Sequence, residues 1–503
     1  MIPGLMACGP TGGCGIRWHM PRINRISTRT VLLLFAVLSV AAIASQGQTL
    51  APTPPMGWNS WDAYGLTIDE ADFKANVAVL AGLKQYGWQY AVIDEGWYLE
   101  NPSGSDTASQ KFVYDANGRL IPALNRFPGA ANGAGLKPLA DWVHAQGLKF
   151  GIHLIRGIPR QSVADNKPIA DSSFHAQDAA DTTDVCPWNK DNYGIRDNAA
   201  GQAWYDSIIA LYAGWGVDFF KVDCISDRPY KASEIRQVAA AIKKTGRPIV
   251  LSLSPGPTAL ANAAEVAQYS QMWRISDDHW DVWSHVPEEG KGEFPMGTLQ
   301  AFSRLVNWRG YVRPGSWPDE DMLPIGSLTP HPGWGEPRES RLTHDEARTE
   351  FTLWAITRSP LILGANLIKL DDFTRSLITN KDVLEMNQHS YGNHPIITLP
   401  PELRKVRAWT ASERAPHDPP RYLALFNLDD QAVHIQVKLA DLSAELNGVQ
   451  LRDLWEGKDL PASDEVDVTL APHACVLYLA QGRLRQMSKR WDVAPMRREP
   501  HPQ

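Results

Sequence analysis

Cysteine is scarce in this sequence, and its placement limits the sites that the chain can build. Only five cysteines occur in 503 residues, and Cys8 and Cys14 fall in a segment that we expect to be removed. The remaining three, at positions 186, 224 and 475, allow at most one internal disulfide. They lack the paired spacing of zinc ligands, so the sequence predicts no metal site.

An excess of basic residues is also missing. The formal charge is −7, and without the four arginines of residues 1–48 the chain holds 45 basic against 56 acidic residues. Proteins that bind nucleic acid present concentrated positive charge. A nucleic-acid partner is therefore not expected.

The apolar run VLLLFAVLSVAAIA, at 31–44, is too short for a comfortable membrane span. It follows several arginines and ends in small residues, which is the form of a secretory signal. We expect residues 1–48 to be a signal peptide, with the true start at Met20, and an uncleaved anchor is the alternative. The mature chain is then secreted or periplasmic and has no membrane contact.

Short apolar runs recur between residues 54 and 367 and alternate with segments of helical apolar spacing. Runs that are apolar on both faces are typical of buried parallel strands, and a further strand is expected between 300 and 325. The alternation predicts a (β/α)₈ TIM barrel, which we place at 49–388. The runs lie at 54–61, 90–98, 148–157, 217–224, 248–256, 272–278 and 360–367, and the clearest helical segments at 71–87, 136–147, 200–216 and 231–246.

From about residue 390 the pattern changes to short alternating segments without a long helix between them. This pattern predicts a C-terminal antiparallel β-sandwich at 389–482. The basic tail at 483–503 is expected to be loose.

Polar side chains follow the predicted barrel strands, at the ends that meet at the catalytic mouth of such a fold. Lys221 and Asp223 are two residues apart, so a strand places them on one face. A neighbouring lysine favours the ionised carboxylate, which suits a nucleophile, and a structural ion pair is the alternative. The strand-end residues are Asp94, Glu95, His153, Lys221, Asp223, Ser254, Arg274, Asp277 and Asp278.

In the segment WRISDDHWDVW, strand alternation places Arg274, Ser276 and Asp278 on one face and Asp277 on the other. Asp278 is therefore the candidate that faces the mouth, and Asp277 is predicted to cap or brace the following turn. Asp281 lies past the strand and is expected to be a solvated or capping carboxylate. Two carboxylates from different strands, one ionised and one protonated, are the machinery of glycoside hydrolysis.

Six motifs, taken in order, resemble glycoside hydrolase family 27, which contains the α-galactosidases and α-N-acetylgalactosaminidases. The resemblance covers residues 50–480, including the C-terminal β domain with its RDLWEGKDL segment. The motifs are PPMGWNSWDAYG, YAVIDEGWY, FFKVDC, WRISDD, GSWPDEDML and FTLWAITRSPLILGANL.

The resemblance implies a retaining double displacement in which Asp223 is the nucleophile. The acid/base aspartate of the family stands four residues after an arginine, which gives Asp278, the residue that alternation also selects. No cofactor is needed, because protonation of the leaving oxygen and carboxylate attack supply both halves of the reaction. The implied sugar-binding residues are Lys221 and Arg274 at hydroxyls, Trp61 at the pocket wall and Asp94 near O4 and O6.

Three positions depart from the family pattern. Animal and plant members have Asp-Asp after the second strand, where this chain has Asp94-Glu95. One extra methylene at a hydroxyl-binding position can change which pyranose fits, so β-L-arabinopyranose, which lacks C6, is an option. His153 replaces a common tyrosine, and it either bonds a hydroxyl or is packed. Ser254 replaces a glutamate of animal-type α-galactosidases and resembles the acetylgalactosaminidase pattern, although a different local backbone also explains it.

The resemblance bears on one further region of the chain. A disulfide in relatives often ties a cysteine near the nucleophile to a neighbouring loop, so Cys224 and Cys186 are a possible pair, with a free thiol at position 224 as the alternative. Trp188 and Tyr193 in that loop either stack on substrate or pack on the surface.

Together, the sequence predicts an exo-acting glycosidase that removes terminal α-D-galactosyl residues from oligo- or polysaccharides, the commoner activity of the family. The alternatives are α-N-acetylgalactosaminidase, β-L-arabinopyranosidase and transglycosylation by the same intermediate. A non-catalytic carbohydrate-binding protein is disfavoured because both Asp223 and Asp278 are present. A carbohydrate is the expected partner, and the oligomeric state stays open.

Overall fold

The computed structural model describes residues 49–102, 110–285, 294–328, 337–413, 415 and 418–481. The predicted signal peptide and its alternative anchor, at 1–48, and the predicted loose tail, at 483–503, lie outside these residues. Within the described ranges, no helix has the length and apolarity that crossing a membrane requires.

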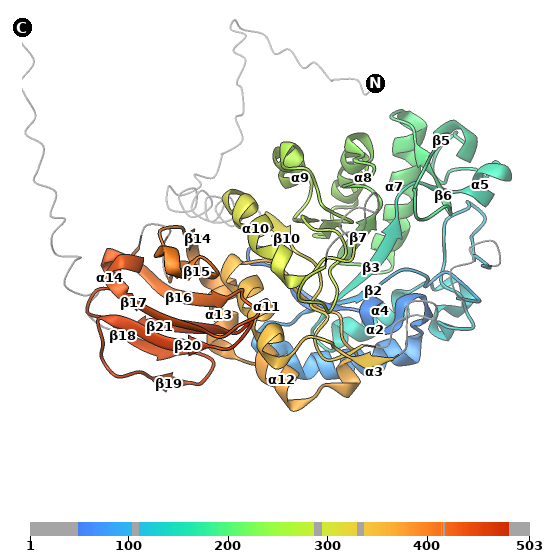
Figure 1. The fold of residues 1–503 in the computed structure, drawn as a ribbon. Coiled ribbons are helices and arrows are strands. Elements are labelled where there is room, and N and C mark those ends of the chain that lie inside the picture. Colours follow the sequence, from blue (N-terminus) through green and yellow to red (C-terminus); the bar gives the residue numbers. More distant parts are fainter. Residues whose placement is uncertain are drawn as a thin grey trace, which may run out of the picture. The chain divides into compact units, whose positions relative to one another are not determined.

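Eight parallel strands form the barrel (Figure 1), in the order β10-β9-β8-β7-β3-β2-β1-β13. A parallel bridge between Leu323, just after β10, and Leu363 of β13 joins the two ends of this sheet. Every run predicted as a strand is present, and β10 lies in the expected interval, so the predicted fold class is confirmed. The strands are β1 Met56–Asn59, β2 Tyr90–Ile93, β3 Lys149–Ile155, β7 Phe219–Asp223, β8 Val250–Leu253, β9 Met272–Arg274, β10 Trp317–Asp319 and β13 Leu361–Leu363.

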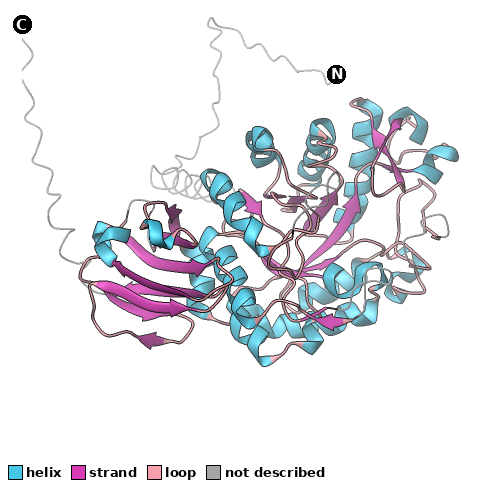
Figure 2. Cartoon of the chain, viewed as in Figure 1, coloured by secondary structure: helices cyan, strands magenta, loops and turns pink. Residues whose placement is uncertain are grey.

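Helices alternate with the strands of the barrel (Figure 2), and several begin and end at residues that favour helix ends. Helix α3 begins after Asp69, whose side chain accepts the amide of Asp72, and α7 begins after Asn198, which accepts the amide of Gly201. Helix α8 stops at Gly246, which takes the left-handed conformation that glycine allows. The main helices are α3 Glu70–Leu83, α4 Lys137–Ala145, α7 Ala199–Gly214, α8 Ala232–Thr245, α9 Ala263–Tyr269, α10 Thr298–Trp308, α11 His344–Thr357, α12 Asp372–Ile378 and α13 Lys381–His389.

The connection from β3 to α7 contains a small three-stranded sheet of β4 (Ile158–Pro159), β5 (Ala180–Val185) and β6 (Asn192–Ile195). The loop between β5 and β6 spans residues 186–191, and we call it the 186–191 loop. It carries Cys186, so its position bears on the site at the barrel mouth.

The C-terminal part consists of antiparallel strands in a six-stranded sheet and a pair, β17 with β20, around a separate apolar core. Helix α11 connects it to the barrel, because Thr349 Oγ1 donates to the carbonyl of His473 and Thr352 contacts Cys475. The strands are β14 Tyr391–Ile396, β15 Val406–Ser412, β16 Pro420–Asn427, β17 Val433–Lys438, β18 Gln450–Asp453, β19 Lys458–Asp459, β20 Glu465–Leu470 and β21 Cys475–Gln481.

Candidate active site

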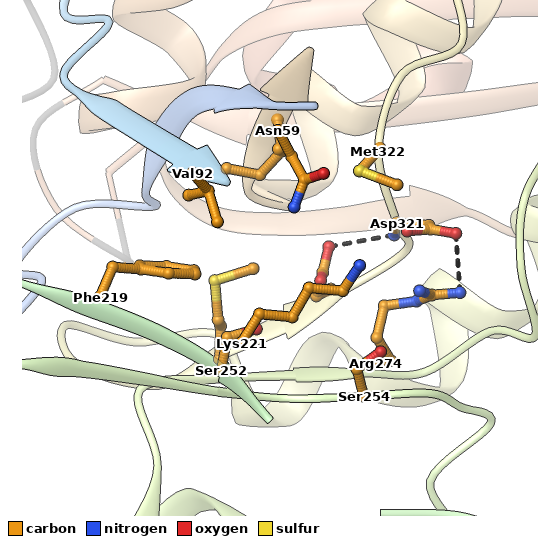
Figure 3. Close-up of a pocket in the computed structure, with 12 residues that line it drawn as sticks. Asn59, Val92, Phe219, Lys221, Ser252, Ser254, Arg274, Asp321 and Met322 are labelled. Carbon is orange, nitrogen blue, oxygen red and sulfur yellow. Dashed lines mark hydrogen bonds and ion pairs between the residues drawn. The ribbon is translucent and has the colours of Figure 1, made fainter. Parts of the chain in front are cut away.

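A cavity of about 860 Å³ lies at the carboxyl ends of the barrel strands. A smaller hollow in the barrel interior adjoins it, and Figure 3 shows Lys221 of β7 and Arg274 of β9 reaching toward Asp321, which lies just after β10. Acidic groups outnumber basic ones in the described lining of the cavity. The carboxyl groups are Asp62, Asp94, Glu95, Asp191, Asp223, Asp277, Asp278 and Asp321, and the cations are Lys221, Arg228 and Arg274.

A buried ion pair occupies the floor. Lys221 Nζ, from β7, lies 2.8 Å from Asp94 Oδ2, which follows β2, and Asn59 Nδ2 donates to the same oxygen at 2.7 Å. Burial alone would raise the pKa of Asp94, but the charges of Lys221 and His153 lower it on balance. Asp94 is therefore an ionised acceptor at neutral pH.

Asp223, at the end of β7, is also kept ionised. Burial opposes its charge, but a contact with His153 Nε2 at 3.5 Å, the charge of Lys221 and the amide of Cys224 lower its pKa on balance. His153 is 1% exposed and is not among the described residues that line the cavity. It approaches Asp223 and Asp94 from the barrel interior, so in this structure it supports the two carboxylates.

The 186–191 loop is tied to the nucleophile candidate. A disulfide joins Cys186 to Cys224, which directly follows Asp223, with a Cα–Cα distance of 6.1 Å. Of the two alternatives for Cys224, the structure has the disulfide. Trp188 of this loop lines the cavity and is 47% exposed, whereas Tyr193, in β6, packs against the guanidinium of Arg160.

Glu95 reaches the cavity wall beside Asp94. Its Oε1 accepts a hydrogen bond of 2.7 Å from Asn189 Nδ2, in the 186–191 loop. Burial raises the pKa of Glu95 to about 8, with help from the charges of Asp191 and Asp223 and against that of His153. At neutral pH this carboxyl is mainly neutral, unlike its neighbour Asp94.

Arg274, at the end of β9, joins two further carboxyl groups. Its Nη2 lies 2.7 Å from Asp321 Oδ2 and 3.2 Å from Asp278 Oδ1. Withdrawal from bulk water raises the pKa of Asp278, and the charges of Asp223 and Asp277 raise it further while Arg274 lowers it. Its side chain is still 42% accessible, because it faces the open cavity. Asp278 therefore keeps its proton to higher pH than Asp223 does.

Strand alternation explains only part of this arrangement, because β9 ends at Arg274. Ser276 does not face the cavity, since its buried hydroxyl donates to the carbonyl of Glu320. Asp277 braces the turn as expected: Oδ1 accepts the amide of Asp278, and Oδ2 lies 2.6 Å from Arg228 Nη2. The inference that Asp278 shares a strand face with Ser276 is therefore wrong, although its contact with Arg274 is real.

The prediction for Asp281 is wrong in one respect. It is not solvated, because it is 1% exposed, and it pairs with Arg338 Nη2 at 2.6 Å while accepting the amide of Arg341. The two chain segments lie far apart in sequence, so alternation within one motif contains no sign of this pairing.

Several lining residues were not predicted. Asp321 follows β10 within the quoted GSWPDEDML motif, so its position at a strand end was an available signal. Asp62 stood in the first motif beside Trp61. Arg228 and Asn189 lie in loops, and nothing in the sequence pattern connects them to Asp277 or Glu95.

Comparisons with known proteins show the family of the chain. The chain matches the family model described as alpha galactosidase A over residues 53–164 and 198–389, and the model of the alpha galactosidase C-terminal beta sandwich domain over 405–480. It is 30% identical to the alpha-galactosidase A of Cellvibrio japonicus (strain Ueda107) over 360 residues, 71% of this chain and 72% of that protein.

Two other relatives act on different sugars. The alpha-N-acetylgalactosaminidase of Gallus gallus is 26% identical over 462 residues, which cover 85% of this chain and 93% of that protein. The crystal structure of a GH27 β-L-arabinopyranosidase from Geobacillus stearothermophilus has a TM-score of 0.79 at 40% identity, covering 86% of this chain and 97% of that one.

Proposed function

Because the chain belongs to the alpha galactosidase A family, glycoside hydrolase family 27, we propose that it is a retaining exo-glycosidase whose preferred glycone is β-L-arabinopyranose. Membership of this family makes the chain a glycosidase. The choice of sugar and the retaining mechanism are the parts of the proposal that the site supports.

The two proposed catalytic residues have opposite protonation preferences. Asp223 is the nucleophile, since the His153 contact, Lys221 and the Cys224 amide keep it ionised against the effect of burial. Asp278 is the acid/base, since removal from water and two nearby carboxylates raise its pKa. Asp278 protonates the leaving oxygen while Asp223 attacks the anomeric carbon, and a water activated by Asp278 then releases the sugar.

The observation that carries the choice of sugar is the place of Glu95 in the cavity wall, next to Asp94. β-L-Arabinopyranose has the ring configuration of α-D-galactose but lacks the C6 hydroxymethyl group. If Asp94 binds near O4 and O6, the longer carboxyl of Glu95, held by Asn189, fills space that C6 needs. One methylene in a pocket discriminates by roughly 10- to 200-fold. The 40% identical arabinopyranosidase supports the same choice.

α-D-Galactose is the second candidate, because the 30% identical relative is named for that activity. The family resemblance predicts the same nucleophile and acid/base for both sugars. α-N-Acetylgalactosamine ranks third, on the small Ser254 at the cavity wall. Lys221, Arg274 and Trp61 are proposed as substrate-binding residues in each case.

A panel of aryl glycosides assayed on the purified chain tests the sugar. We expect kcat/KM to be highest for the β-L-arabinopyranoside, and Glu95→Asp to move the ratio toward the α-D-galactoside by about tenfold, the effect of one methylene. The matched control is Glu100→Asp, because Glu100 is exposed and lies five residues away. A wild-type preference for the galactoside would refute the choice of pentose.

The mechanism is tested separately. Asp223→Asn should abolish turnover, and Asp278→Ala should slow poor leaving groups far more than good ones, because only poor ones need a proton. Asp141→Asn, on the exposed face of α4, is the control. Proton NMR of the first-formed sugar should show the anomer of the substrate, and the opposite anomer would exclude a retaining mechanism.

A further inference from the structure

Asp62 has a buried carboxyl that the proposed mechanism does not use. It lies in α2 (Trp61–Tyr64), directly after Trp61, and it lines the cavity. The residue is 1% exposed, like Asp94, and its Oδ2 has no hydrogen-bond partner among the described residues. A buried carboxyl without a hydrogen-bond partner destabilises a fold, so a ligand in the cavity that Asp62 lines can stabilise it by supplying a hydrogen bond.

The fold makes room for this carboxyl in a specific place. A Cβ atom at Gly364, directly after β13, would lie 1.8 Å from Asp62 Oδ2 and 2.6 Å from its Cγ. Any other residue at position 364 would therefore displace the Asp62 side chain. The missing side chain at Gly364 leaves the space that Oδ2 occupies beside the end of β13, while Asp62 as a whole lines the cavity.

The surroundings also determine its charge. Burial raises the pKa of Asp62 well above its usual range, and the carboxylates of Asp321, Asp94 and Asp278 raise it further while Lys221 lowers it. Asp62 therefore keeps its proton to higher pH than an exposed aspartate does. A protonated carboxyl can donate a hydrogen bond, which an ionised Asp94 or Asp223 cannot.

We propose that Asp62 is a substrate-binding residue whose carboxyl donates a hydrogen bond to a hydroxyl oxygen of the sugar in the cavity. A sugar hydroxyl both donates and accepts, so it can donate to the ionised Asp94 and accept from Asp62. The inference rests on the proposed function, because it takes a glycone as the ligand. It adds a neutral donor to a cavity in which Asp94 and Asp223 are acceptors.

Calorimetric titration with L-arabinose and with D-galactose tests this role on the full chain. Asp62→Ala should weaken binding of the preferred sugar at least tenfold, while Asp62→Asn should stay within threefold, because the amide NH₂ also donates. The control is Glu320→Gln. Glu320 is another buried carboxyl without a partner, and it is not among the described residues that line the cavity.

Unchanged affinity in Asp62→Ala would overturn the inference, and so would an Asp62→Asn variant that loses as much as Asp62→Ala. A melting temperature of sugar-free Asp62→Asn at or above that of the wild type is expected, since no hydrogen bond within the described chain is lost. If Asp62→Ala fails to fold, Asp62→Leu replaces it, because leucine has a similar shape and no donor, and unchanged affinity in that variant would overturn the inference. A wild-type chain that binds neither sugar would instead overturn the proposed glycone, and the inference with it.

Discussion

Replacing Lys221 with methionine should expose the cost of a buried, unpaired carboxylate. In the wild type, Lys221 Nζ lies 2.8 Å from Asp94 Oδ2, and the exposed fractions of the two side chains are 15% and 2%. Removing one partner of a buried pair costs about 3–5 kcal/mol. Asp94 can bind a proton and so avoid being an unpaired buried charge. The free-energy cost of that protonation depends on pH.

That cost follows from the unfolded pKa of aspartate. Protonating a carboxyl of pKa about 3.9 costs about 1.36 kcal/mol for each pH unit above that value. The cost of protonating Asp94 in Lys221→Met is therefore limited to about 4 kcal/mol at pH 7 and about 1.5 kcal/mol at pH 5. The hydrogen bonds from Asn59 and the amide of Glu95 remain, so the observed loss can be smaller.

The sign of the pH dependence of the unfolding free energy distinguishes the effect of an unpaired Asp94 carboxylate from the effect of lost packing. In the wild type the pKa of Asp94 is lowered, so its stabilising effect is present above the unfolded pKa and is constant between pH 5 and 7. In Lys221→Met the pKa of Asp94 is raised, so the free energy of unfolding should fall as pH rises through this window.

Urea unfolding followed by tryptophan fluorescence at pH 5, 6 and 7 measures the effect. Lys137→Met is the control, because Lys137 and Asp141 form an exposed pair that is worth less than about 1 kcal/mol. The double variant Asp94→Asn/Lys221→Met should lose the extra pH dependence. A pH-independent loss in Lys221→Met, or a slope that survives in the double variant, would refute the reasoning.

Two other changes should act on the reaction without touching either proposed catalytic residue. Arg228→Ala removes the cation that holds Asp277, so the pKa of Asp278 should rise and the basic limb of the kcat/KM profile should move to higher pH; an unmoved limb would contradict this. Cys186→Ser removes the disulfide of the loop that carries Asn189, so Glu95 loses part of its support. In the aryl glycoside panel, the preference for the β-L-arabinopyranoside over the α-D-galactoside should then fall.

The barrel could be predicted because its strands are buried on both faces and therefore appear as apolar runs. For strand β10 the sequence predicts only an interval, 300–325, because the strand has three residues and contains Pro318. Strand-end residues such as Asp94, Asp223 and Arg274 could be predicted with it, because the fold brings strand ends to one mouth.

The rest of the site depends on contacts between loops, which carry no periodic signal. Side chains alternate between two faces only within a strand, and β9 ends at Arg274. The prediction that Ser276 faces the cavity is wrong for this reason. Asp281 was misjudged because its partner, Arg338, comes from a distant segment. The proposed role of Glu95 depends on Asn189, which lies in the loop that the disulfide ties to Cys224.

The charge balance of the cavity explains why so many carboxyl groups can share one site. Eight described carboxyl groups face three cations, so they cannot all ionise without strong mutual repulsion. The structure resolves this by separating their pKa values: Asp94 and Asp223 are lowered, and Asp62, Glu95 and Asp278 are raised. In the proposed mechanism, ionised groups supply attack and hydrogen-bond acceptance, while protonated groups supply a proton and hydrogen-bond donation, so the carboxyl group performs four tasks according to its surroundings.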